Sequence, residues 1–157
     1  MSLHSTTRVP VNYEYVALVG KAVYVFAYYE WNIIWIIEFL KIGFVDEYSR
    51  GNPMTSGAVQ KSFRTVIENP ATSFAKISKQ ELTDCCNQFD ALIIKRNSLI
   101  HAHPFTDSSG EQILTYQTKL SKPLPDMKWP PAEIERIISE FDVAAFNAGE
   151  ILDKLRK

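Results

Sequence analysis

A long apolar stretch near the amino terminus constrains this chain more than any other feature. Pro10 favours a helix start and Gly43 favours a helix end, and the residues between them are compatible with one long helix. Lys21, Glu30 and Lys41 interrupt the stretch, and its uncharged runs fall far short of the roughly 20 residues that a bilayer requires. We therefore expect a buried helix and no membrane partner.

Large apolar side chains occupy nearly every direction around this first helix. They include the neighbours Val25, Phe26, Tyr28 and Tyr29 and the run from Ile33 to Ile37. One covering layer of a small domain would leave part of that surface in water, so a second partner surface is needed. We predict a homodimer through the first helix and through the third helix, which is described below.

Size and composition limit the class of protein. With 157 residues and 46% apolar residues, the chain fits a single globular domain over residues 1–157. Lys and Arg number 17 against 18 for Asp and Glu, so the net charge of −1 gives no overall attraction to nucleic acid. Adjacent Cys85 and Cys86 indicate reduced, buried thiols, and the start of the chain lacks the apolar core of a signal peptide. We expect a cytoplasmic protein.

The second helix has clear boundary signals. Asn52 and Pro53 are typical of an N-cap and first helical position, and the apolar stripe that follows stops at Asn69 and Pro70. The next segment, 71–77, is compatible with another turn of helix or with a loop.

The third helix begins at a capping box. Ser78 is followed three residues later by Glu81, just before a strong apolar pattern. The helix should run to about Ala102, because Pro104 disfavours helical geometry at His103.

Turn-forming residues then separate the third helix from the last one. Asp107–Gly110 predicts a turn before the strand-like run 113–118, while Lys122–Pro125 and Trp129–Pro131 are expected to be rigid connectors. Residues 131–156 show apolar side chains at helical spacing. The sequence thus predicts an all-α fold: an up-and-down bundle of four to five helices, with a small hairpin or extended arm before the last helix.

Two polar residues interrupt the apolar stripe of the third helix. The apolar positions step by three and four residues from Leu82 to Leu99, but Arg96 and Asn97 occupy positions where apolar side chains are expected. The solvent face is expected elsewhere, at Asp84, Asn87, Gln88, Ala91, Lys95 and Ser98.

A guanidinium withdrawn from water needs compensation. We expect Arg96 to meet a phosphate, a polar cleft or a carboxylate, and Asp107 or Glu111 would serve as a purely structural partner. His101 lies four residues after Asn97 on the same face, where it either acts in a site or simply ends the helix. It lies about 140° around the helix from Arg96, so a cleft between two subunits would be needed to gather both.

Metal and cofactor motifs are missing from the sequence. His101 and His103 would need at least one further zinc ligand, and His4 with two thiols makes a poor set. No phosphate-cradling glycine loop and no serine-nucleophile motif is present. We expect neither a metal nor a cofactor.

The segment Arg96-Asn97-Ser98-Leu99-Ile100-His101 resembles the signature of the HEPN superfamily, in which Arg is followed after four to six residues by His, with a polar residue commonly just after the Arg. The resemblance covers mainly residues 78–156. It implies a helical bundle that dimerises and brings two copies of the motif into one cleft. In active members that cleft is a metal-independent ribonuclease centre, often in toxins or antiviral systems.

Carried over by position, the resemblance implies that His101 is the general acid and base at the RNA 2′-hydroxyl. Arg96 would hold the scissile phosphate and Asn97 would orient either group. We expect the neighbouring Lys95, Ser98 and His103 to bind substrate, and an antitoxin or regulatory protein to be a further partner. Other members are non-catalytic, so the alternative is a HEPN-like domain that binds a nucleotide, RNA or a protein.

Overall fold

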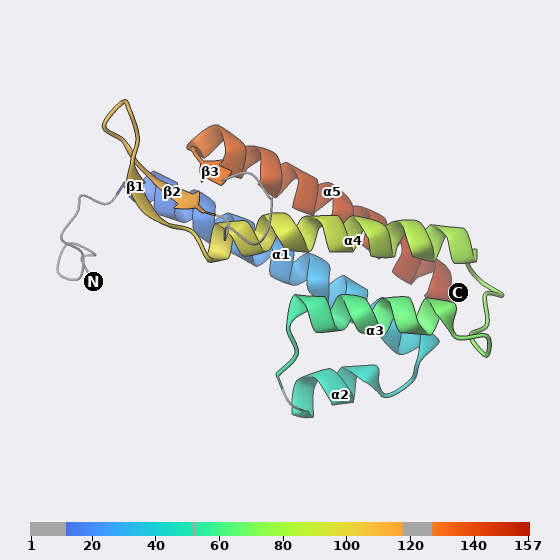
Figure 1. The fold of residues 1–157 in the computed structure, drawn as a ribbon. Helices are drawn as coiled ribbons and strands as arrows, with labels where there is room; N and C mark the ends of the chain where they lie inside the picture. Colours follow the sequence, from blue (N-terminus) through green and yellow to red (C-terminus); the bar gives the residue numbers. More distant parts are fainter. Residues whose placement is uncertain (1–11, 52, 118–126) are drawn as a thin grey trace.

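The computed structural model describes residues 12–51, 53–117 and 127–157. This part of the chain is mostly helical, with a small antiparallel sheet before the last helix (Figure 1). The prediction of an all-α bundle with a small hairpin or extended arm is therefore right for the helices, but the structure has a three-stranded sheet at that place. The elements are α1 (Tyr13–Leu40), α2 (Phe44–Arg50), α3 (Ser56–Glu68), α4 (Lys79–Ile100), β1 (His103–Thr106), β2 (Gln112–Tyr116), β3 (Met127–Trp129) and α5 (Pro131–Arg156).

The two long terminal helices, α1 and α5, run parallel and in close contact. The Tyr15 hydroxyl bonds the carbonyl of Trp129 just before α5, and the Asn32 side-chain amide donates to the carbonyl of Ala145 over 3.1 Å further along. Small buried residues, Ala22 on α1 and Ala148 on α5 among them, let the two backbones approach. α3 and α4 lie beside this pair (Figure 1).

The first helix ends three residues before its predicted end. Gly43 adopts a φ of +95°, which favours glycine, and serves as the N-cap of the short helix α2, which the sequence analysis missed. The Glu38 carboxylate accepts hydrogen bonds from the backbone N–H groups of Gly43 and Val45. These bonds lower the pKa of Glu38 and hold the corner between α1 and α2.

The start of the second predicted helix is wrong. Asn52 lies outside the described residues, and α3 begins at Ser56, with the Thr55 hydroxyl accepting from the N–H of Ala58 at 3.2 Å. The predicted stop is confirmed, because Asn69 caps the end of α3. The 71–77 segment is a loop with no helix.

The capping box of α4 is confirmed. The Ser78 hydroxyl accepts from the N–H of Glu81 at 3.1 Å, and the Glu81 carboxylate accepts from the N–H of Ser78. The helix ends at Ile100 with His101 as its C-cap, close to the predicted end.

The predicted hairpin is confirmed as β1 and β2, and Gly110 supplies the left-handed residue of its turn with a φ of +88°. The sequence analysis missed β3, which pairs antiparallel with the other side of β2. Trp129 thus ends a strand instead of belonging to a connector, and Lys122–Pro125 lies outside the described residues.

Aromatic side chains fill the centre of the bundle where α1, α4 and α5 meet. The Phe26 ring lies 5.0 Å from the Phe141 ring, and the Tyr29 ring lies 5.5 Å from the Phe89 ring. Both cysteines are buried and free, as predicted. The predicted stripe of the last helix is also confirmed, because all ten of its members are buried: Ile134, Ile137, Ile138, Phe141, Ala144, Ala145, Ala148, Ile151, Leu152 and Leu155. Across the described residues, no helix has both the length and the apolarity needed to cross a bilayer.

Candidate functional site

The Arg96 side chain lies half-buried against the aromatic core. Its guanidinium carbon lies 5.5 Å from the centre of the Phe26 ring, and its Nη1 donates to Oδ1 of Asn97 over 3.0 Å. A guanidinium over an aromatic face is attracted to the negative charge of the ring. Asn97 thus binds one N–H donor of the guanidinium, and Phe26 of α1 supports the plane of the guanidinium.

Arg96 forms no ion pair with a carboxylate of the described residues. The structural partner considered in the sequence analysis is not used, because the Asp107 carboxylate accepts from the hydroxyl and N–H of Ser109 and from the N–H of Glu111. The bond from the Ser109 hydroxyl is the largest cause of the lowered pKa of Asp107. Glu111 forms no ion pair with Arg96 either.

Two residues that the sequence analysis did not select lie in the electrostatic surroundings of Arg96. Burial raises the pKa of Tyr48, on α2, and the Glu30 carboxylate raises it further, whereas the Arg96 guanidinium lowers it. In the described part of the chain, Oε1 of Glu30 is buried and accepts no hydrogen bond. The sequence feature that could have identified Glu30 is its charge, because this residue lies inside the most apolar helix of the chain.

Asn97 and His101 lie one turn apart on the same face of α4, where Asn97 is half-buried and His101 is exposed. The backbone N–H of His101 donates to the carbonyl of Asn97 at 3.0 Å, which closes the last turn of the helix. Ile94, three residues before Asn97, shares this face and is 45% exposed. The His101 side chain is exposed. The structure therefore places an amide and an imidazole beside an exposed apolar side chain.

The other predicted substrate-binding residues of α4 have structural roles. The ammonium of Lys95 pairs with the Glu140 carboxylate of α5, which also binds Arg136. Ser98 is only 2% exposed, and its hydroxyl donates to the carbonyl of Lys95 at 2.8 Å. The expectation that Ser98 lies on the solvent face is therefore wrong, because packing around α4 covers it.

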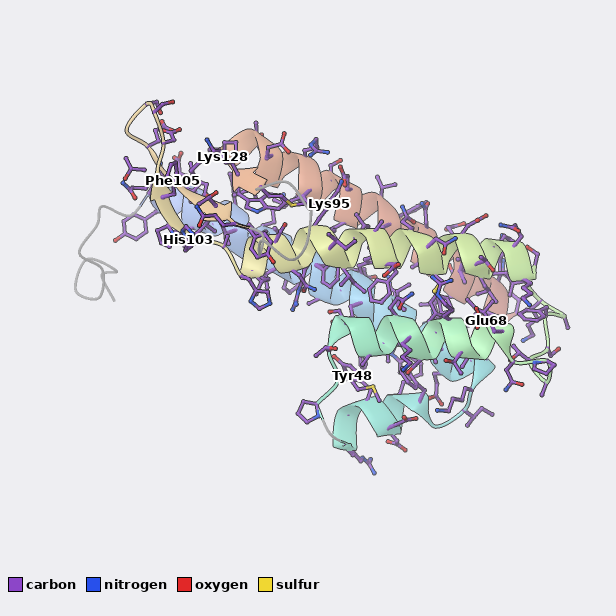
Figure 2. The ribbon with its side chains drawn as sticks, in the orientation of Figure 1. Tyr48, Glu68, Lys95, His103, Phe105 and Lys128 are labelled. Carbon is purple, nitrogen blue, oxygen red and sulfur yellow. The ribbon has the colours of Figure 1, made fainter. Side chains whose placement is uncertain are left out.

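His103 lies on β1 and is exposed (Figure 2). Its Nδ1 lies 3.4 Å from the carbonyl oxygen of Pro104, and its strand pairs it with Thr115 of β2. It is separated from His101 by one residue of chain, at the same end of the molecule.

Four pockets formed by described residues lie away from the motif. The pocket of about 690 Å³ near the end of α1 is lined by Lys41, Lys61 and residues of α3 and the loop after it, and three further pockets also have linings without Arg96 and His101. In the part of the chain that the structure describes, no group of three His, Cys, Asp or Glu side chains is arranged to hold a metal ion.

Exposed apolar side chains of α1 form a continuous solvent-facing stripe. Tyr24 is 75% exposed, and the stripe also contains Val16, Tyr28 and Trp31. Val16 and Tyr24 are eight residues apart, and Tyr28 and Trp31 follow at steps of four and three, so all four lie on one side of the helix. Single exposed apolar residues are ordinary, whereas several on one helix face are typical of interaction surfaces.

Comparison with known proteins gives no relative: no family model matches the chain, and no curated protein or solved structure matches it.

Proposed function

We propose that this chain is a HEPN-like, metal-independent endoribonuclease that acts as a homodimer. Arg96 binds the scissile phosphate, His101 is the general acid and base, and Asn97 orients the Arg96 guanidinium. The observation that carries the proposal is the half-buried Arg96, whose guanidinium lies against Phe26 without an ion pair to a carboxylate of the described residues. A cation without an ion pair at such a place is suited to a phosphate.

The reaction uses the RNA 2′-hydroxyl as the nucleophile. His101 removes its proton while the 2′-oxygen forms a bond to phosphorus, and the bond from phosphorus to the 5′-oxygen breaks as that oxygen takes a proton. The products are a 2′,3′-cyclic phosphate and a 5′-hydroxyl. Arg96 stabilises the negative charge that develops on the phosphoryl oxygens. DNA is not cut, because it lacks the 2′-hydroxyl.

A second copy of the chain completes the proposed cleft. Arg96 and His101 differ by about 140° in direction around α4, so the two side chains of one chain point to different sides. The exposed stripe of α1 and the exposed Ile94 of α4 supply an apolar surface for the partner chain. In the dimer, Arg96 of one chain and His101 of the other contact the same phosphate.

The test is cleavage of RNA in the presence of a chelator. Wild type is expected to cleave RNA but not DNA of the same sequence and to leave cyclic phosphate ends. His101→Ala should lower the rate by about 10²- to 10⁴-fold, the usual contribution of acid–base catalysis. Arg96→Ala should also abolish cleavage. Arg64→Ala is the matched control, because Arg64 lies on α3, where it bonds Asn87, and should keep full activity.

Two results would contradict the proposed ribonuclease activity. Equal cleavage by wild type, Arg96→Ala and His101→Ala would identify a contaminating nuclease. RNA or nucleotide binding that depends on Arg96, without cleavage, would favour the alternative of a non-catalytic HEPN-like domain. If cleavage is confirmed, toxicity on expression, and its relief by an antitoxin or regulatory protein, would test the toxin role.

A further inference from the structure

One face of the small sheet carries an aromatic ring, an imidazole and an ammonium group. The register aligns His103 of β1 with Thr115 of β2, and Thr115 with Lys128 of β3. Phe105, two residues after His103, points to the same side of the sheet because side chains alternate along a strand. His103, Phe105 and Lys128, which lie on the two outer strands, are exposed and lie at one end of the molecule (Figure 2). We call His103, Phe105 and Lys128 the sheet platform.

The Lys128 side chain crosses the central strand to reach Phe105. Its Nζ lies 5.7 Å from the centre of the Phe105 ring, although β1 and β3 are the two outer strands. Its methylene groups thus lie over β2, in keeping with the burial of Ile113 and Thr115 on this face. The Phe105 residue stays 40% exposed, so aromatic surface and positive charge are presented together.

Among the described residues, no acidic side chain forms an ion pair with the sheet platform. Lys128 has no ion pair there, and no Asp or Glu occupies the described strands. Asp107 and Glu111 belong to the turn after β1, where Asp107 is engaged by its own loop. Asp126, two residues before Lys128, lies outside the described residues. The described part of the platform therefore presents an ammonium group without an ion-paired acid.

The platform continues directly from the Arg96–His101 motif. His101 caps α4, and β1 begins at His103 after a single intervening residue. Phe105 follows His101 by four residues, a span of about 13 Å in extended chain. A strand of nucleic acid bound at the motif thus reaches the platform within a few nucleotides.

We infer that the sheet platform binds single-stranded RNA next to the motif, with a base stacked on Phe105 and a phosphate on Lys128. Aromatic rings combined with cations are the usual means of holding single strands, whose bases expose their faces. Duplex RNA keeps its bases stacked and cannot use the ring. The inference rests on the proposed function for its choice of RNA, and it adds the substrate form, an unpaired segment.

The test measures binding separately from cleavage. The probe is a fluorescein-labelled RNA of about 12 nucleotides, within the range that single-strand sites cover. Its anisotropy is followed with His101→Ala protein, in which cleavage is expected to be about 10²- to 10⁴-fold slower. In this background Phe105→Ala should weaken binding about 5- to 150-fold, and Phe105→Trp should restore it. Lys128→Ala should weaken binding and reduce the slope of log affinity against log salt by about 0.7.

Matched controls separate the platform from general surface effects. Phe146→Ala removes an exposed aromatic residue of α5, and Lys79→Ala removes an exposed cation at the far end of α4. Neither should change binding. Duplex RNA of the same length should bind more weakly than the single strand and should not respond to Phe105→Ala.

The outcomes distinguish this inference from the proposed function. If wild type cleaves RNA but Phe105→Ala and Lys128→Ala bind and cleave normally, the platform inference is wrong and the enzyme stands. If wild type does not cleave RNA but the two variants lose RNA binding, the binding role of the platform is supported and the proposed ribonuclease function is wrong. Equal loss with Phe146→Ala, or a platform that captures only a protein, would overturn the inference.

Discussion

The Tyr15 hydroxyl donates a hydrogen bond of 2.6 Å to the carbonyl oxygen of Trp129, 114 residues further along the chain. The same hydroxyl accepts a bond of 2.8 Å from the backbone N–H of Leu114. One side chain of α1 therefore joins the bundle to both β2 and β3. This contact helps to fix where the sheet lies relative to α1 and the core.

Tyr15→Phe should destabilise the protein by about 1–3 kcal/mol, because it leaves the N–H of Leu114 and the carbonyl of Trp129 without their partner. The free energy of unfolding in urea measures this loss. Tyr24→Phe is the control, since its ring is largely exposed, and should change stability by less than about 0.5 kcal/mol. Equal effects of the two variants would show that the bridging hydroxyl contributes nothing.

Arg96→Met should keep the fold while removing function. The change loses a cation–π contact worth about 0.5–1 kcal/mol but breaks no ion pair in the described residues. Phe26→Ala, which empties a core position beneath it, should cost about 3–5 kcal/mol. If thermal unfolding shows the two variants to be equally destabilised, Arg96 is a structural residue and its place in the proposed site is wrong.

Charge on the exposed stripe of α1 should dissociate the proposed dimer. Tyr24→Glu combined with Tyr28→Glu would require desolvation of two carboxylates against the partner chain. Light scattering at micromolar concentration should show a dimer for wild type and a monomer for this variant. Asn147→Glu, at an exposed position of α5, should stay dimeric. A monomeric wild type would contradict the dimer prediction directly.

The thiol of Cys85 should resist alkylation in the native protein. Burial raises the pKa of Cys85 to about 12, so the reactive thiolate is rare at pH 8. Iodoacetamide should modify it only after unfolding in urea, as mass spectrometry can show. Fast modification of the native protein would contradict this prediction.

The same raised pKa has a consequence for stability. The folded state holds the Cys85 proton more tightly than the unfolded chain, whose thiol titrates near about 8.5. This contribution to stability is fully present below that value and is lost as pH rises towards about 12. Between these values, the free energy of unfolding of wild type should fall more than that of Cys85→Ala.

Local signals explain which elements were predictable. The capping box at Ser78 and Glu81 and the ten-residue apolar stripe of α5 depend on neighbours within a few turns, and both were predicted correctly. The helix α2 was missed because its seven residues after Gly43 are too few to show a repeated helical pattern. The strand β3 was missed because three residues become a strand only by pairing with β2.

The residues of the candidate site also fall into those that a local pattern predicted and those that only packing placed. Arg96 and Asn97 were found because they interrupt a periodic pattern within one helix. Glu30 and Tyr48 were missed because they reach the surroundings of Arg96 from other helices, and only packing brings them near. The burial of Ser98 could not be predicted from the pattern of one helix either, since it depends on what packs against α4.

The amino-acid order alone determined where the long helices and the hairpin form and which helix carries an unexpected cation, because capping and periodicity act over short separations. Tertiary packing decided that Arg96 lies on Phe26 and that Lys128 crosses the sheet to Phe105. Such contacts join residues far apart in the chain. Their geometry therefore depends on how whole helices and strands fit together.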